Sequence, residues 1–227
     1  MKMNERTLWI KNARLGFPHL LVPQPSTNPA AAAKYNCVFI IEQGAPEWNE
    51  ILEMAHAMAL EKWTVNANGI MGMISNDKKL RCYGFGADKV DTKTGLVYEG
   101  FQDMMWISGS SDTKPDLRGQ DAMPCPPTAP LNTMFVGGNY VEGVISIWPQ
   151  DNEHGRAIRS QLDGVQYIRE GEKFGAVGPD VGTIFEAVPG APAASSPMPG
   201  TGTGPAAPAP LAPATPAPVV SNINDFL

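Results

Sequence analysis

The pattern with the clearest chemical content is a strand-like segment in which a tryptophan and two serines alternate with apolar residues. A period of two over residues 104–111 places Trp106 on one face with the serines, and Met105 and Ile107 on the other. Residues 140–148 repeat the pattern, because their terminal aromatic residues share a face with polar side chains. An exposed ring can stack on a nucleobase, which contributes roughly 1–3 kcal/mol per base. We therefore predict base stacking by Trp106, Tyr140 and Trp148.

Basic residues lie close in sequence to these segments. They are Lys78, Lys79, Arg81, Lys114, Arg118, Arg156, Arg159, Arg169 and Lys173. Aromatic rings on a sheet with lysine and arginine around them bind single-stranded nucleic acid, because bases stack while phosphates follow the positive groove. The predicted phosphate contacts are Lys79, Arg81, Lys114, Arg156 and Arg159. Each ring taken alone also suits a hydrophobic core, so that alternative stays open.

Sequence motifs for catalysis or metal binding are absent. The histidines and cysteines form no HExxH or CxxC motif and have no metal-ligand spacing. They are His19, His56, His154, Cys37, Cys82 and Cys125. No P-loop, GxSxG or dinucleotide-binding glycine motif occurs. We therefore expect no enzymatic activity, no metal and no cofactor, with free thiols in a reducing compartment.

The segments that carry these residues are predicted mostly as strands. Strand-like stretches, separated by turn residues, cover residues 7–17, 34–41, 80–85, 104–111, 140–148 and 157–168. The first is expected to stop at Pro18, and a Pro/Ala loop follows over residues 23–33. The clear helix is Pro46–Trp63, which begins with proline and glutamate and has apolar residues at helical spacing. Five or six strands with one main helix predict a mostly β fold, either a small barrel or an α+β sheet.

The composition divides the 227-residue chain into three parts. Residues 187–221 contain ten proline and ten alanine residues and no charged or aromatic residue, so they cannot form a packed core. We predict a folded domain over residues 1–186, a disordered linker over 187–221 and a C-terminal tip over 222–227. The tip restores bulky apolar groups beside an acid, and we predict partner binding by Asp225, Phe226 and Leu227.

The net charge of −6 excludes a strongly basic, histone-like protein but leaves room for a local basic groove. The N-terminus has no apolar core of a signal peptide, and the longest apolar runs are far shorter than the roughly 20 residues of a membrane span. An intracellular protein that does not enter membranes is therefore expected.

Four segments, taken in order, resemble a family of phage-encoded single-stranded DNA-binding proteins. They are Asn12–Pro23, Lys34–Ile41, Tyr98–Pro115 and a closing hairpin formed by Tyr140–Gln150 and Gly155–Gly175. The resemblance covers about residues 7–175 and implies an OB-like barrel. It also implies single-stranded DNA binding without sequence readout, and a role in phage replication and recombination in the cytoplasm of the bacterial host. Proteins of this family often end in a disordered arm with an acidic-aromatic tip, and the end of this chain resembles such an arm. The resemblance implies that the tip recruits replication or recombination proteins.

The sequence departs from this family at two positions. Glu142 stands where the family tends to be basic, which predicts weak phosphate binding at that end of the groove. The chain ends in Leu227 rather than phenylalanine, and Asp225 is the single acid of the tip, so strong self-inhibition by the tail is not expected. Two other functions stay open: a phage structural or scaffolding protein with a tethering tail, and a small enzyme without a recognised motif. Salt-sensitive, sequence-tolerant binding to single-stranded DNA would distinguish a DNA-binding protein from these two alternatives.

Overall fold

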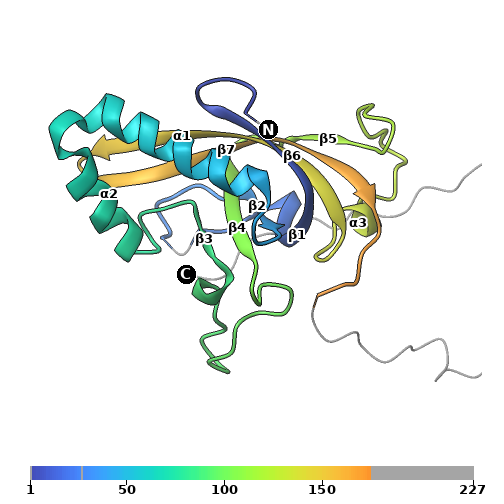
Figure 1. Cartoon of the computed structure of the whole chain (residues 1–227). Coiled ribbons are helices and arrows are strands. Elements are labelled where there is room, and N and C mark those ends of the chain that lie inside the picture. Colours follow the sequence, from blue (N-terminus) through green and yellow to red (C-terminus); the bar gives the residue numbers. More distant parts are fainter. Residues whose placement is uncertain (1, 27, 175–227) are drawn as a thin grey trace, which may run out of the picture. The chain divides into compact units, whose positions relative to one another are not determined.

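The computed structural model describes residues 2–26 and 28–174, and strands dominate it (Figure 1). The strands are β1 (Thr7–Gln24), β2 (Lys34–Ile41), β3 (Tyr83–Phe85), β4 (Met105–Ser111), β5 (Asp116–Arg118), β6 (Tyr140–Asn152) and β7 (Gly155–Arg169). They form a seven-stranded sheet in the order β3-β4-β2-β1-β6-β7-β5. A parallel pairing of Ser110 with Gln161 joins β4 to β7, so five of the strands curl into a partly open barrel. This arrangement confirms the predicted OB-like, mostly β fold.

The long β6–β7 hairpin shows how the sequence fills the barrel. Along β6, Val141, Ile145 and Ile147 are buried, while the residues between them are more exposed. This is the alternation that a half-buried strand requires. Gly143 occupies an inward position against the ring of Phe39, where a Cβ atom would lie 2.2 Å from the nearest ring carbon. A side chain at position 143 would therefore displace the core phenylalanine.

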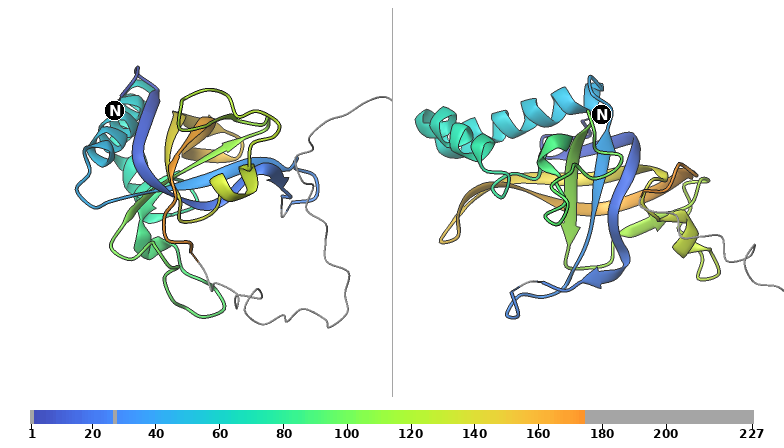
Figure 2. Two further views of the ribbon diagram at one scale, coloured as in Figure 1. Left: turned by 90° about the vertical axis from the view of Figure 1, so that its right-hand side faces the viewer. Right: turned by 90° about the horizontal axis from the view of Figure 1, so that it is seen from below.

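Two helices lie beside each other on one side of the sheet (Figure 2). They are α1 (Pro46–Trp63) and α2 (Ala67–Asn76), joined by the 3₁₀ turn η1 (Thr64–Asn66). The buried face of α1 includes both of its tryptophans, and Trp63 Nε1 donates a hydrogen bond of 2.9 Å to Asp151 Oδ2 on β6. The bounds of α1 match the prediction, whereas α2 was not predicted. Its buried residues Ala67, Ile70 and Ile74 recur at helical spacing, which is a signal for a helix in the sequence itself.

Strand β1 does not stop at Pro18, contrary to the prediction. The pairing of β1 with β2 shifts register between Gly16 and His19, and the strand then continues to Gln24. Proline has no N–H group for the ladder, but the irregularity accommodates it without breaking the strand. Phe17, within this bulge, has a φ angle of 44°.

The segment between β3 and β4 covers part of the outer face of the sheet. It contains the 3₁₀ turn η2 (Gly86–Asp88) and an isolated bridge between Val90 and Val97. Phe101 from this segment forms a second hydrophobic cluster with Val38, Ile40 and Trp106, separate from the main core. The outward face of β4 is therefore covered at its start and open farther along.

The remaining elements are short or differ at their ends. The helix α3 (Leu131–Met134) and strand β5 were not predicted, β3 is shorter than expected, and β6 and β7 are longer. Across residues 2–26 and 28–174, no helix has the length and apolarity needed to cross a membrane. The predicted linker 187–221 and tip 222–227 lie outside the described residues.

Candidate nucleic-acid interface

A groove runs over the outer faces of β2 and β4. It consists of two hollows, of about 570 and 620 Å3, which share Lys34, Ser108 and Ser110. We call it the β2–β4 groove. The residues that line it include Phe17, His19, Lys34, Asn36, Arg81, Lys89, Ser108, Ser110, Asp112, Trp148, Gln150 and Arg159.

The floor of the groove follows from strand periodicity. Ser108 and Ser110 point outward on β4 and pair with Val38 and Asn36 of β2. Their small side chains leave the sheet surface low, and Ser108 Oγ donates a hydrogen bond of 3.1 Å to the carbonyl oxygen of Cys82. Residues from the β1–β2 connection line one end, and residues beside the β6–β7 turn line the other. In OB folds, this face and these two loops are where oligonucleotides bind.

The charge of the β2–β4 groove is positive. Four lysine or arginine side chains and one aspartate line it. Arg159 is held in place, since Nη1 donates to the Lys79 carbonyl oxygen at 3.0 Å and Nε donates to Gln150 Oε1 at 3.3 Å. Lys34 Nζ lies 3.2 Å from Asp112 Oδ1, but both side chains are at least half exposed, so this pair is weak and can yield to a phosphate.

Arg81 lines the same groove but is mostly engaged within the protein. Its Nη2 lies 3.0 Å from Asp88 Oδ2, and its Nη1 donates to the Tyr83 carbonyl oxygen at 2.7 Å. The side chain is 11% exposed, and its buried Nε has no hydrogen-bond partner among residues 2–26 and 28–174. Arg81 therefore contributes positive potential at the groove wall more than an open phosphate-binding fork.

Trp106 is the main correction to the predicted site. It does share the outward side of β4 with the serines, but its side chain is 3% exposed. The segment between β3 and β4 folds over the ring, and Trp106 Nε1 donates a hydrogen bond of 2.8 Å to the Phe85 carbonyl oxygen. Lys89 Nζ lies 3.7 Å from the ring centroid. The prediction of an open stacking platform at this residue is wrong, because strand alternation does not reveal that the segment preceding β4 folds back over the ring.

The structure separates the other two predicted aromatic residues. Trp148 lies in the β2–β4 groove, is 36% exposed and pairs with Arg159 across the β6–β7 hairpin. Tyr140 lies outside the groove, where the guanidinium carbon of Arg169 is 3.3 Å from its ring centroid. That of Arg14 is 5.7 Å away. A base cannot stack on the side of the Tyr140 ring that Arg169 covers.

Three predicted basic residues are exposed but do not line the β2–β4 groove. They are Lys79, Lys114 and Arg156. Arg156 Nε lies 3.3 Å from Asp151 Oδ1, and the backbone of Lys79 receives the hydrogen bond from Arg159. Their contact with phosphate stays a prediction.

Several groove residues were missed at the sequence level: Phe17, His19, Lys34 and Lys89. Lys34 opens the predicted second strand and could have been found, because alternate residues of that strand share the face of the groove. Lys89 could not, since it lies in the irregular segment between β3 and β4, and only the fold of that segment brings it over the ring of Trp106. Burial lowers the pKa of Lys89 from 10.5 to about 8, although the neighbouring Asp88 acts in the opposite direction.

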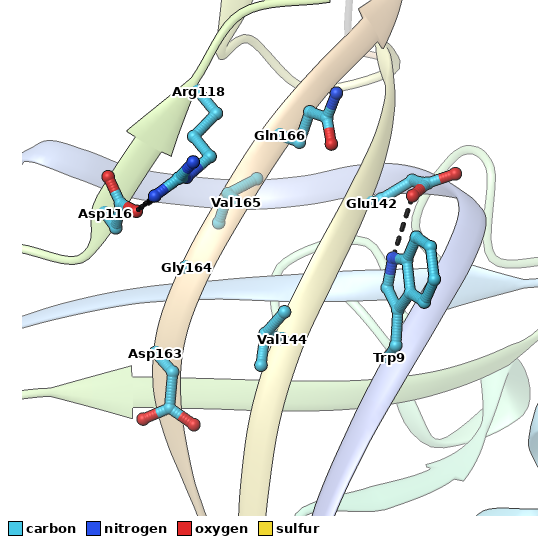
Figure 3. Close-up of a pocket in the computed structure, with 9 residues that line it drawn as sticks. All are labelled: Trp9, Asp116, Arg118, Glu142, Val144, Asp163, Gly164, Val165 and Gln166. Carbon is cyan, nitrogen blue, oxygen red and sulfur yellow. Dashed lines mark hydrogen bonds and ion pairs between the residues drawn. The ribbon is translucent and has the colours of Figure 1, made fainter. Parts of the chain in front are cut away.

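A separate hollow, of about 310 Å3, lies elsewhere on the sheet between β5, β6, β7 and β1 (Figure 3). We call it the acidic pocket. Its lining residues are Trp9, Asp116, Arg118, Glu142, Val144, Asp163, Gly164, Val165 and Gln166. Trp9 Nε1 donates to Glu142 Oε2 at 2.8 Å, and Arg118 Nη2 lies 2.7 Å from Asp116 Oδ2. Glu142 therefore lines the acidic pocket and not the β2–β4 groove, and weak phosphate binding near it stays a prediction.

The described residues hold no group of three or more histidine, cysteine, aspartate or glutamate side chains placed to bind a metal ion. Burial raises the pKa of Cys82 to about 12 and that of Cys37 well above its usual range. Both thiols are therefore protonated at neutral pH and suit packing rather than nucleophilic chemistry.

Comparisons with known proteins agree with this geometry. A family model described as "Enterobacter phage Enc34, ssDNA-binding protein" matches residues 6–185. Protein p50 of Acyrthosiphon pisum secondary endosymbiont phage 1 is 26% identical over 168 residues, which are 73% of this chain and 84% of that protein.

Two solved structures share the fold. The single-stranded DNA-binding protein of bacteriophage Enc34 in complex with ssDNA has a TM-score of 0.60 at 20% identity, covering 76% of this chain and 91% of that one. A second structure of the bacteriophage Enc34 single-stranded DNA-binding protein has a TM-score of 0.58 at 18% identity, covering 81% of this chain and 92% of that one.

Proposed function

The chain belongs to the family of the Enterobacter phage Enc34 ssDNA-binding protein, and on that premise we propose that it binds single-stranded DNA in the β2–β4 groove without reading its sequence. The observation that carries this proposal is one surface that combines the exposed ring of Trp148 with four basic side chains. The family is one of DNA-binding proteins rather than enzymes.

The composition of the groove supports binding without sequence readout. Serine, asparagine and backbone groups form the floor, while the positive charges stand at its walls and ends. Stacking on Trp148 tolerates any base, because every base has a π face, and the charges attract any phosphate. A duplex does not fit this scheme, since its bases are paired and stacked on each other and cannot lie against a protein ring.

Binding to oligo-dT at two salt concentrations tests the proposal directly. The logarithm of the binding constant should fall with the logarithm of salt at about 0.7 per neutralised phosphate, and we expect about three to five phosphates. A duplex of equal length is the control and should bind much more weakly. A flat salt response, or equal affinity for the duplex, would contradict the proposal.

We further propose that the protein protects transient single strands during phage replication or recombination in the cytoplasm of the host. In this proposal Asp225, Phe226 and Leu227 bind a replication or recombination protein, with the apolar side chains in a pocket and the carboxylates against basic residues. Recovery of replication proteins by the full chain and by a chain ending at residue 221 tests this role. Equal recovery would exclude it, and a loss of ssDNA affinity on truncation would assign the tip to DNA binding instead.

A further inference from the structure

An aromatic pocket of about 410 Å3 continues the β2–β4 groove at its Phe17 end. The aromatic pocket is lined by Gly16, Phe17, Pro18, Tyr98, Glu99, Phe101, Gly137 and Phe174. Phe17 lines both this pocket and the groove, so the two hollows meet at its side chain. Four of the eight lining residues are aromatic, which is the composition that accepts a flat, unsaturated ring.

The backbone holds Phe17 in an unfavourable conformation. Its φ angle of 44° is uncommon for a residue with a side chain, and the following Pro18 disfavours it further. The β1 bulge provides the local irregularity that imposes this conformation. The result is a phenylalanine that is 41% exposed at the junction of the two hollows instead of buried in the core. Strained, exposed residues of this kind concentrate at binding sites.

The neighbours of Phe17 fix the position of its ring. The centroid of Phe101 lies 5.4 Å away with an interplanar angle of 21°, which is a stacked geometry. The centroid of Tyr98 lies 4.9 Å away at an angle of 78°, which is an edge contact. Phe101 is 1% exposed, whereas Tyr98 is 37% exposed. The ring of Phe17 is thus supported from the core side and still accessible from the pocket.

The opposite wall of the aromatic pocket is also held in place. The guanidinium carbon of Arg14 lies 4.2 Å from the ring centroid of Phe174, and Arg14 Nε donates to the Gly138 carbonyl oxygen at 3.1 Å. Phe174 packs closely on Gly100, where a Cβ atom would lie 2.1 Å from the ring. Gly100 has a φ angle of 79°, so glycine suits this position for its conformation as well as for its size. The pocket therefore has two preformed walls, which lowers the entropic cost of binding.

We propose that the aromatic pocket takes one unstacked nucleobase from the strand that lies in the β2–β4 groove, with Phe17 as the stacking residue. This inference rests on the proposed function and extends the DNA path beyond the groove. The nucleobase is favoured over a peptide side chain because Phe17 also lines the positively charged groove. A strand lying there brings its next base to the pocket without a second binding event.

The test combines a change in the protein with a change in the DNA. A length series first defines the shortest oligo-dT that reaches full affinity, and one abasic position is then moved through it. For the wild type, one terminal abasic position should weaken binding by about 5- to 150-fold, the range for loss of one stacked base. Phe17→Leu should weaken binding to the intact oligonucleotide by a similar factor and make it insensitive to that abasic position.

Matched variants separate the loss of stacking from other effects. Phe17→Tyr keeps the ring and should keep the affinity. Tyr98→Leu should reproduce part of the loss, because it removes the ring in edge contact with Phe17. Phe85→Leu removes a ring that is 54% exposed but lines neither hollow, so it should bind as the wild type does. The salt slope should not change in Phe17→Leu, since a stacking contact neutralises no phosphate.

The outcomes distinguish this inference from the proposed function. Wild-type affinity in both Phe17→Leu and Tyr98→Leu, with salt-dependent ssDNA binding retained, would overturn the nucleobase site alone and leave the groove intact. Equal sensitivity of wild type and Phe17→Leu to every abasic position would also overturn it, because the pocket would then hold something other than a base. Absence of ssDNA binding by the wild type would overturn the proposed function itself.

Discussion

The β2–β4 groove and the acidic pocket are two hollows on one sheet, and each contains a tryptophan. They differ in charge: one acid and four basic residues line the groove, whereas three acids and one basic residue line the pocket. They also differ in how the ring is engaged, because Trp9 donates its N–H to Glu142 while Trp148 lies beside Arg159. An aromatic residue on a strand therefore does not define a DNA site without the charge around it.

The same hairpin contributes to both regions. Toward the β6–β7 turn, Trp148 pairs with Arg159 and faces the groove. Toward the opposite end, Glu142 pairs with Gln166 and both line the acidic pocket. Under the proposed function, the Trp148 end of the hairpin attracts phosphate and the Glu142 end repels it. The overall charge of −6 hides this separation.

A third tryptophan, Trp106, lies where the segment between β3 and β4 closes the groove. Its ring is buried against Phe101 and Ile40, so Trp106→Ala should lower the free energy of unfolding by about 3–5 kcal/mol. Urea denaturation followed by circular dichroism measures this change. Trp148→Ala is the control and should shift the unfolding free energy by less than about 1 kcal/mol, since its ring is partly exposed. A stability unchanged by Trp106→Ala would mean that the segment over the ring opens in solution.

The next largest effect is expected from removing Trp148 from the β2–β4 groove, compared with removing Trp9 from the acidic pocket. Trp148→Ala should weaken ssDNA binding by about 1–3 kcal/mol, the contribution of one stacked base. Trp9→Ala should leave ssDNA affinity unchanged, because its ring belongs to the acidic pocket. Fluorescence anisotropy with labelled oligo-dT measures both. Equal losses in the two variants would show that DNA also crosses the acidic face.

Much of this fold could be predicted from local sequence. Strand periodicity, a proline and a glutamate at the start of α1, and turn residues between strands are local signals, and they predicted a mostly β fold and the helix Pro46–Trp63. The OB-like barrel was implied by the family resemblance. Strand β5 has three residues, too few for a periodic signal. The passage of β1 through Pro18 depends on a bulge, which is set by pairing with β2 rather than by the residues themselves.

The site could be predicted only in part, for the same reason. Trp148, Arg81 and Arg159 lie on strands or beside them, and the structure brings all three into one groove. The burial of Trp106 and the position of Lys89 depend on how the segment between β3 and β4 folds back over β4, which strand periodicity does not predict. Glu142 was placed at the groove by the family resemblance, which does not show which hollow of this sheet the side chain lines.

Charge removal tests the electrostatic half of the comparison. Lys34→Ala together with Arg159→Ala should reduce the salt slope by about 1.4, which is 0.7 for each lost phosphate contact. The affinity should fall by about 0.5–2 kcal/mol, because both charges are at least partly exposed. Arg118→Ala removes the single basic residue lining the acidic pocket and should change neither quantity. An unchanged slope in the double variant would place the phosphates elsewhere, with Lys79, Lys114 and Arg156 as the next candidates.

The smallest expected effect is a pH dependence confined to the groove. Because burial lowers the pKa of Lys89 to about 8, its ammonium group loses most of its charge between pH 7 and pH 9. A phosphate favours the charged form, so ssDNA affinity should fall over this interval by about 0.2–1 kcal/mol, the range of one exposed ion pair. Lys89→Arg stays charged and should remove the pH dependence.

Folding stability should respond to Lys89 in the opposite direction. The unfolded chain keeps this lysine protonated up to its ordinary pKa of 10.5, whereas the folded protein releases the proton near pH 8. Between these values the unfolded state binds more protons, so the free energy of unfolding should rise with pH. Thermal melts and anisotropy titrations at pH 7, 8 and 9 would show rising stability together with falling ssDNA affinity. If both quantities fell together and Lys89→Arg followed the wild type, the titrating group would lie outside the groove, and Lys89 would not contact the DNA.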